Sequence, residues 1–225
     1  MEESSAVLFS IGPVEVSGAV VTTWVIIALL ALLSWLATRR LKDVPGPIQT
    51  IAEMAVSSLD NFVTGVLGKV RARKYFPLFA TFFIFIIISN YTGILPGAGK
   101  IKGFSVPTSS LSVTAGLALI AITATHVIGV KEVGGKHYLK SFVKPFFLMV
   151  FLNALEQIVR PVSLALRLYG NVYGEEAVTH QLYEIFPIIL PLVMNVLSLL
   201  LCFIQAMVFT LLLAIYVEEG ISEEG

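Results

Sequence analysis

Long stretches without charge constrain this chain more than any other feature. Lys, Arg, Asp and Glu are absent from residues 16–38, 75–99, 104–130 and 185–217. About 20 apolar residues in a helix span the hydrocarbon core of a bilayer. Only 13% of the 225 residues are charged, against about 25% in ordinary soluble domains, and the mean hydropathy is +0.88. These values predict an integral membrane protein and exclude an ordinary soluble domain.

Charge and cysteine content exclude several further classes. Fifteen basic residues balance fifteen acidic ones, so no bulk attraction to nucleic acid is expected. Cys202 is the single cysteine, so one chain alone cannot form a disulfide or a cysteine-rich zinc site. No H-E-x-x-H motif or other assembled catalytic set is present. We expect no enzyme activity of the chain itself, no metal and no cofactor.

The fold class predicted is an all-α integral membrane protein, a single membrane domain over residues 1–225. Five membrane helices are expected, with one amphipathic interfacial helix between the first and second. The membrane helices are placed at 16–38, 75–96, 108–130, 141–178 and 185–217, and the interfacial helix at 47–71. The last run of about 33 residues would be about 50 Å long as a helix, so it must tilt strongly or lie partly along the membrane.

The expected interfacial helix follows the Pro45-Gly46-Pro47 break. Its apolar residues recur at i, i+3, i+4, i+7 spacing, and polar residues occupy the opposite face. We expect this helix to lie on the cytoplasmic surface of the membrane. The same pattern also suits an interface with a soluble partner subunit, so both interpretations stay open.

Basic clusters flank the expected membrane helices. They comprise Arg39, Arg40 and Lys42; Lys69, Arg71, Arg73 and Lys74; and Lys131, Lys136, Lys140 and Lys144. The positive-inside rule makes these flanks cytoplasmic, which places the N-terminus outside and the C-terminus inside. The acidic residues Glu218, Glu219, Glu223 and Glu224 are then expected to form a solvated cytoplasmic end.

Charged residues interrupt the fourth hydrophobic segment. A charge in a membrane helix costs between about 2.5 and 17 kcal/mol, so it usually has a function. Helical spacing aligns a polar or small stripe of Asn153, Glu156, Arg160, Ser163, Arg167, Asn171 and Gly174. Glu156 can pair with Arg160 at i, i+4, so Arg160 is either a structural or a functional charge. Arg167 has no acid three or four residues away, and its permanent charge needs a partner from elsewhere.

The last helix offers a second polar stripe, formed by Asn195, Ser198, Cys202 and Gln205. Antiparallel packing could bring Gln205 to Arg167, whereas Asn195 and Ser198 are better explained as hydrogen bonds between membrane helices. Glu176 lies about 180° around the helix from Arg167 and could line a separate water-filled path. Glu175 and Glu176 could instead mark an exposed helix end.

Residues 161–176, PVSLALRLYGNVYGEE, resemble subunit a of the F-type ATP synthase. Residues 90–96, NYTGILP, and residues 204–209, IQAMVF, are similar to further patterns of that family. The resemblance implies a stator subunit of the membrane Fo sector, whose last two helices form a long tilted hairpin against a ring of c subunits. Its implied partners are the c ring, the b subunits of the peripheral stalk and the remainder of the F1Fo complex, in the cell inner (plasma) membrane.

The resemblance also implies roles for individual residues in moving H+ or Na+ through two half-channels. Arg167 matches the essential arginine, Gln205 its glutamine neighbour, Asn171 and Glu176 polar residues of the ion path, and Asn90 a residue of the outer channel. Ser198 stands where some relatives carry a histidine, and Gly93 where some carry an acid. The alternative function is a secondary transporter that binds an anionic substrate through Arg167.

Overall fold

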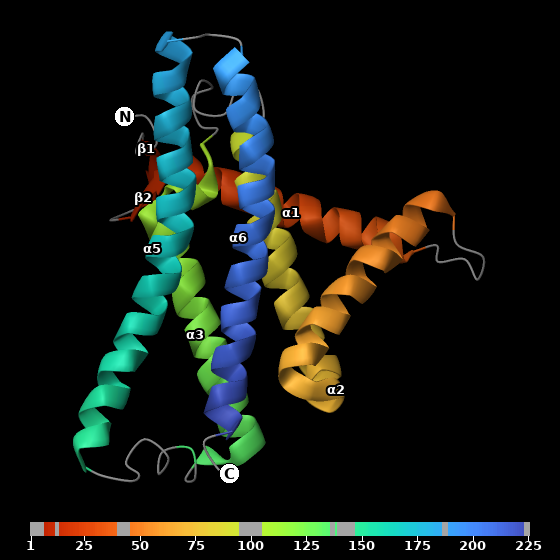
Figure 1. The fold of residues 1–225 in the computed structure, drawn as a ribbon, viewed down its shortest axis with the longest axis vertical. Helices are drawn as coiled ribbons and strands as arrows, with labels where there is room; N and C mark the ends of the chain where they lie inside the picture. The colour runs from red at the N-terminus through yellow and green to blue at the C-terminus, as the bar shows by residue number, and fades with distance from the viewer. Residues whose placement is uncertain are drawn as a thin grey trace.

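The computed structural model describes residues 7–11, 14–39, 46–94, 105–135, 138, 147–185 and 189–222. Its long helices are α1 (Gly18–Thr38), α2 (Pro47–Tyr91), α3 (Leu111–Val133), α5 (Phe147–Ile185) and α6 (Ile189–Ser222), shown in Figure 1. Short 3₁₀ turns lie at Thr92–Ile94 and Pro107–Ser109. Residues 141–146, where the sequence places the start of the fourth membrane helix, lie outside the described residues. The helix itself continues beyond 178 to Ile185.

A small β-hairpin precedes α1 and adds two strands to an otherwise helical chain. Strand β1 (Val7–Ile11) pairs antiparallel with β2 (Val14–Ser17). Alternation of Val14 and Val16 with polar residues suits a strand, because side chains two apart share a face. These strands are much shorter than a membrane-spanning run, so the length of the apolar runs does not predict them.

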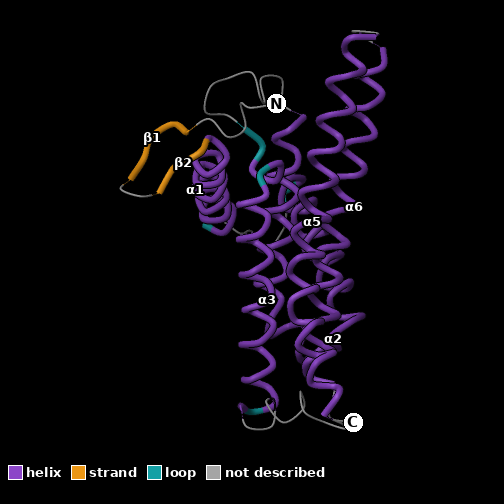
Figure 2. The backbone as a smooth tube through the Cα atoms, turned by 90° about the vertical axis from the view of Figure 1, so that its left-hand side faces the viewer, coloured by secondary structure: helices purple, strands orange, loops and turns teal. Residues whose placement is uncertain are grey.

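Helix α1 matches the first expected apolar run but lies across the other helices rather than along them (Figures 1 and 2). Most of its side chains are exposed, among them Trp24, Val25 and Leu32. Gly18, Ala19, Thr22 and Ile26 are its buried residues. With so few buried contacts, α1 is the least anchored of the long helices.

Helix α2 consists of two helical segments joined at a kink, over the residues where the sequence places an interfacial helix and a second membrane helix. Its backbone departs from helical geometry at Gly68, with φ 73° and ψ 158°, so the helix kinks there. Before the kink, Leu59, Val63 and Leu67 are buried. Ile51, Met54 and Val56, earlier in the helix, are exposed. The segment before Gly68 therefore turns one apolar face to the protein and exposes others.

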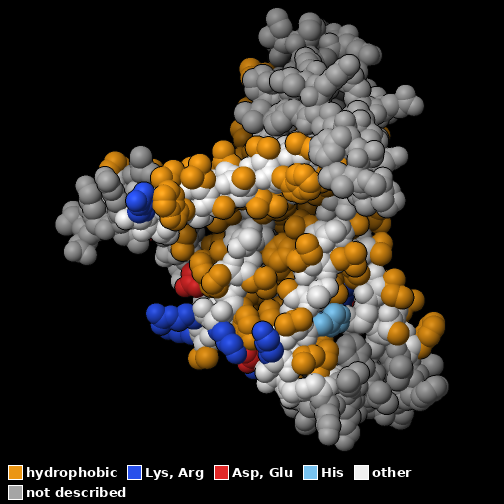
Figure 3. Space-filling model, turned by 180° about the vertical axis from the view of Figure 1, so that it is seen from behind, with side chains coloured by type: hydrophobic (Ala, Val, Ile, Leu, Met, Phe, Trp, Pro, Cys, Tyr) orange, Lys and Arg blue, Asp and Glu red, His pale blue; other side chains and the backbone are white. Residues whose placement is uncertain are grey.

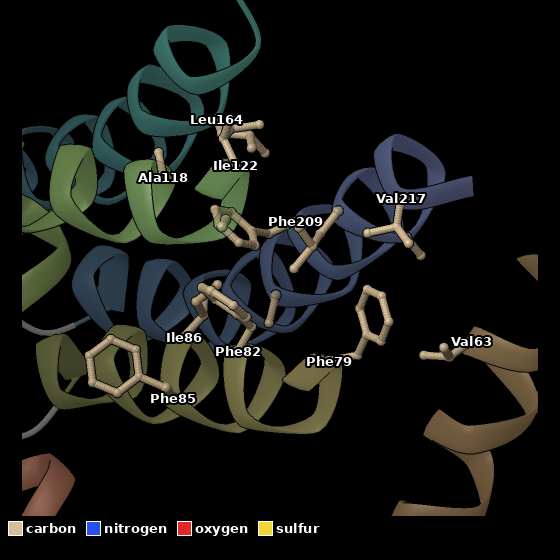
Figure 4. Packing of buried hydrophobic residues seen from close by; sticks show 14 of the residues in the cluster. Val63, Phe79, Phe82, Phe85, Ile86, Ala118, Ile122, Leu164, Phe209 and Val217 are labelled. Carbon is tan, nitrogen blue, oxygen red and sulfur yellow. The ribbon is translucent and has the colours of Figure 1, made fainter. Parts of the chain in front are cut away.

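Helices α2, α3, α5 and α6 form the bundle and contain the core, with α6 packed on α2 and α5 packed on α3 (Figure 2). Phe82 of α2 stacks on Phe209 of α6 with ring centroids 5.8 Å apart. Ile86, Leu164 and Leu168 are almost completely buried, and Figure 4 shows Ile86, Phe82 and Phe209 between the helices. Aromatic and branched side chains thus fix how α2, α5 and α6 face one another.

Four of the described helices are long and apolar enough to cross a membrane: Gly18–Thr38, Gln49–Ile94, Leu111–Val133 and Leu192–Ile221. Helix α5 has the length but carries Glu156, Arg160, Arg167, Glu175 and Glu176. Hydrophobic side chains cover much of the face in Figure 3, and Lys and Arg side chains gather in its lower half. The chain is a multi-pass membrane protein.

Ion pairs join the helices at the end of the bundle where α6 terminates. Arg71 of α2 pairs with Glu218 of α6 at 3.1 Å, and Lys74 pairs with Glu132 of α3, which also accepts a hydrogen bond from Tyr75. Glu219 pairs with Arg160 of α5 at 2.9 Å. Glu218 and Glu219 are therefore not merely solvated, as the sequence suggested, because their basic partners come from helices distant in sequence. Glu223 and Glu224 lie outside the described residues.

Candidate functional site

Arg167 lies on an exposed face of α5. Leu164, Ala165 and Leu168 beside it are buried and anchor this turn against the bundle. The guanidinium is exposed, and no hydrogen bond or ion pair to it is found within the described part of the chain. The structure thus presents a permanent positive charge outward from a packed helix turn.

Asn171, one turn beyond Arg167, is bonded across the interface between α5 and α6. Its Nδ2 donates a hydrogen bond of 2.6 Å to Oε1 of Gln205. Gln205 is 4% exposed, and its Nε2 has no partner among the described residues. The antiparallel packing expected from the sequence is present, but it brings Gln205 to Asn171 rather than to Arg167, because the register of α6 sets it one turn away.

A cavity of about 40 Å³ lies between α2, α5 and α6. Its lining consists of Asn90, Asn171, Val172, Glu175, Leu201, Cys202 and Gln205. Asn90 is 2% exposed, and neither its Oδ1 nor its Nδ2 has a partner within the described residues. A polar cavity of this size can hold water, since one molecule needs about 10 to 15 Å³ and two or more polar partners. Three amides and a carboxylate therefore surround a space suited to water or a small ion.

The two neighbouring acids of α5 point in different directions. Glu175 lines the cavity, is half-buried and hydrogen-bonds with the buried hydroxyl of Ser198 on α6. Glu176 is exposed and is not among the residues that line the cavity. Adjacent residues on a helix are about 100° apart, so only one of the two can face α6. The sequence favoured Glu176 for a water-filled path, whereas the structure brings Glu175 to the cavity.

Arg160 belongs to a second polar group, two turns from Arg167. It is 8% exposed, and its Nη2 bonds both Glu156, at 2.8 Å, and Glu219 of α6, at 2.9 Å. Its guanidinium also lies 4.8 Å from the ring centre of Tyr216. The expected i, i+4 pair with Glu156 is present, and the second carboxylate comes from a helix that sequence spacing could not identify.

The remaining candidates lie outside these arrangements. Ser163 and Asn195 are half-buried and do not line the cavity between α2, α5 and α6. Cys202 also lines the cavity, although the sequence indicated no function for it. Its position between Ser198 and Gln205 on the polar stripe of α6 could have predicted this. Among the described residues, no group of three or more His, Cys, Asp or Glu side chains could hold a metal ion.

Comparison with known proteins supplies the family. The family model described as "ATP synthase A chain" matches residues 20–218, most of the chain. The chain belongs to the ATP synthase subunit a family.

Individual relatives agree over nearly the whole length. ATP synthase subunit a of Trichlorobacter lovleyi is 41% identical over 211 residues, covering 92% of this chain and 88% of the relative. ATP synthase subunit a 3 of Pelobacter propionicus is 43% identical over 209 residues, covering 91% and 88%. ATP synthase subunit a of Moorella thermoacetica is 38% identical over 210 residues, covering 93% of each chain. The ATP synthase subunit a match includes α5 and almost all of α6, and with them Arg167 and the cavity.

Proposed function

We propose that this chain is the stator subunit of the Fo sector of an ATP synthase, coupling ion movement to rotation of a c ring. The observation that carries the proposal is the exposed side chain of Arg167, which has no partner among the described residues and lies one helical turn from the polar cavity. The subunit itself does no covalent chemistry, since catalysis resides in F1. The b subunits and the remainder of F1Fo complete the set of partners.

Electrostatics explains how such an arginine works. A rotor carboxylate crosses lipid as a neutral group because it holds H+ or Na+. An opposite charge within about 4 to 6 Å lowers a carboxyl pKa by about 1 to 3 units, so approach to Arg167 releases the bound ion. The guanidinium cannot deprotonate and repels a cation that attempts to pass it directly. Ion flow is then possible only with rotation.

The cavity supplies the outer half-channel in this proposal. Asn90, Asn171, Glu175 and Gln205 offer oxygen and nitrogen atoms to a hydrated ion between three helices. We assign Glu176, which is exposed beside Glu175, to the approach to this path. Arg167 separates this half-channel from the cytoplasmic one. Each elementary charge that descends 100 mV contributes about 2.3 kcal/mol, so several ions are needed for each ATP.

The proposed orientation follows the charge distribution. In this proposal α5 also crosses the membrane, which brings the number of crossings to five. Its charged residues face protein, water or the rotor rather than lipid. The N-terminus then lies outside and the C-terminus lies in the cytoplasm, with the chain in the plasma membrane. The ion pairs of Arg71, Lys74 and Arg160 all gather at the proposed cytoplasmic end.

A secondary transporter fits the site less well. An arginine that binds an anionic substrate would lie inside a closed, polar pocket. Arg167 is exposed and does not line the cavity between α2, α5 and α6. The outward charge is better suited to a partner that passes over the surface of α5.

The decisive experiment is ATP-driven ion uptake by vesicles containing the whole complex. Arg167→Ala should abolish uptake, because no fixed charge then releases the rotor's ion. Arg73→Ala is the matched control: it removes an exposed arginine of α2 that does not line the cavity, and should leave uptake near the wild-type rate. Full uptake by Arg167→Ala would refute the proposed function.

The same vesicles distinguish the two ions. Uptake measured with and without Na+ gives a sodium-dependent signal only if Na+ is carried. If H+ is the ion, uptake proceeds without Na+ and collapses when a protonophore is added.

A further inference from the structure

We infer that Arg160, held between Glu156 and Glu219, is a positioning residue that fixes the orientation of Arg167 toward the rotor. This inference rests on the proposed function, since it concerns how the exposed arginine is held. Its basis is the side-chain cluster of Arg160, Glu156, Glu219 and Tyr216, which joins α5 to α6.

The part of α5 that precedes Arg160 is poorly anchored. From Phe151 to Val159 no side chain is buried, and Phe151, Leu155 and Ile158 are each at least half exposed. Figure 1 shows this part of α5 diverging from α6 toward its start. Arg160 is the first buried side chain of α5 after that stretch. Its ion pair with Glu219 therefore ties α5 to α6 at the point where they separate.

The backbone of α5 is weakened at the same place. Pro161 lies inside the helix and has no N–H, so the carbonyl of Gln157 loses its usual hydrogen bond. The Glu156–Arg160 pair spans the same helical turn and supplies a side-chain link beside the missing backbone bond. Glu219 adds a second link, from α6. The cluster thus stiffens α5 at its weakest point, less than two turns before Arg167.

Such stiffness matters to a residue that attracts a moving charge. The rotor carboxylate pulls on Arg167 as it arrives and as it leaves, and a displacement of about 1 Å can cost about 100-fold in rate. Buried Leu164 and Leu168 hold the turn that contains Arg167, whereas the Arg160 cluster limits bending of α5 before that turn. Loss of the cluster should therefore weaken coupling most when the motor works against a steep ion gradient.

The test substitution is Glu219→Gln, which removes the tie to α6 and leaves Arg160 paired with Glu156. Its matched control is Glu218→Gln, the same change one residue earlier, because Glu218 bonds Arg71 of α2 whereas Glu219 bonds Arg160 of α5. Purified whole complexes in vesicles are compared by ions pumped for each ATP hydrolysed, at increasing opposing ion gradients. A purely structural loss would lower the amount of assembled complex without changing this ratio.

We expect Glu219→Gln to lower the ratio about threefold at the steepest gradient, with Glu218→Gln within about 1.5-fold of wild type. Arg160→Gln should lower the ratio further, and Arg160→Lys should restore part of it because the ammonium can bond both carboxylates. If Glu219→Gln and Arg160→Gln keep the wild-type ratio while Arg167→Ala loses pumping, the inference about Arg160 is overturned and the proposed function stands. Unchanged pumping in Arg167→Ala would instead overturn the proposed function.

Discussion

At the scale of single residues, the contact between Asn171 and Gln205 lies at the interface of α5 and α6, beside the cavity and with Gln205 buried. An unsatisfied polar group in such a place costs about 1 to 3 kcal/mol, more than an ordinary hydrogen bond contributes. Gln205 already carries one unpartnered amide nitrogen beside the cavity. That atom is available to water or an ion, while the bond to Asn171 holds the side chain in place.

Replacing one of the two amides leaves the other unpaired. Replacing both should therefore slow uptake less than the two single effects combined. We expect Asn171→Leu and Gln205→Leu each to slow ATP-driven uptake several-fold, because each leaves the other amide unpaired. The double variant should be no slower than the slower single variant, since both remove the same hydrogen bond. A double-mutant cycle of uptake rates measures this coupling, and strictly multiplicative effects would contradict it.

At the scale of elements, the kink of α2 depends on a single glycine. Gly68 has φ 73° and ψ 158°, a conformation that L side chains rarely adopt, and no atom lies within 4 Å of where a Cβ would be. A substitution there is costly through the backbone alone. The kink lies between a segment with buried Val63 and Leu67 and a segment with buried Phe79 and Ile86.

Gly68→Ala should destabilise the protein by about 1 to 3 kcal/mol. Gly65→Ala is the control, because Gly65 is helical, equally uncrowded and expected to tolerate or benefit from alanine. Thermal denaturation of the purified complex compares the two. Equal midpoints for both variants would show that the kink is not required.

At the scale of the whole molecule, ion pairs among four helices, α2, α3, α5 and α6, meet at one end of the bundle, and the positive-inside rule assigns that end to the cytoplasm. The chain suits a labelling test, because its one cysteine, Cys202, is 4% exposed. A membrane-impermeant thiol reagent should label Arg73→Cys only from the cytoplasmic side. It should label Lys100→Cys, in the loop that the sequence places outside, only from the outer side. Labelling of both from one side would contradict the proposed orientation.

The sequence by itself determined which segments are helical and apolar, the family, and the isolation of Arg167 within its own helix. These follow from local rules, since hydrophobic run length and the spacing of charges along a helix need no knowledge of neighbouring elements. The same rules predicted the Glu156–Arg160 pair. They could not predict the β-hairpin or the exact position of the break in α2 at Gly68, because both depend on backbone geometry over a few residues.

Only the tertiary structure decided which polar groups meet. A helix fixes the angle between its own residues, but its rotation and axial register against another helix are set by packing, here by Leu164, Leu168 and Phe209 among others. That packing places Gln205 on Asn171 rather than on Arg167. It also turns Glu175 toward the cavity and Glu219 onto Arg160. Register between helices is a property of the assembled core, which no single segment of sequence contains.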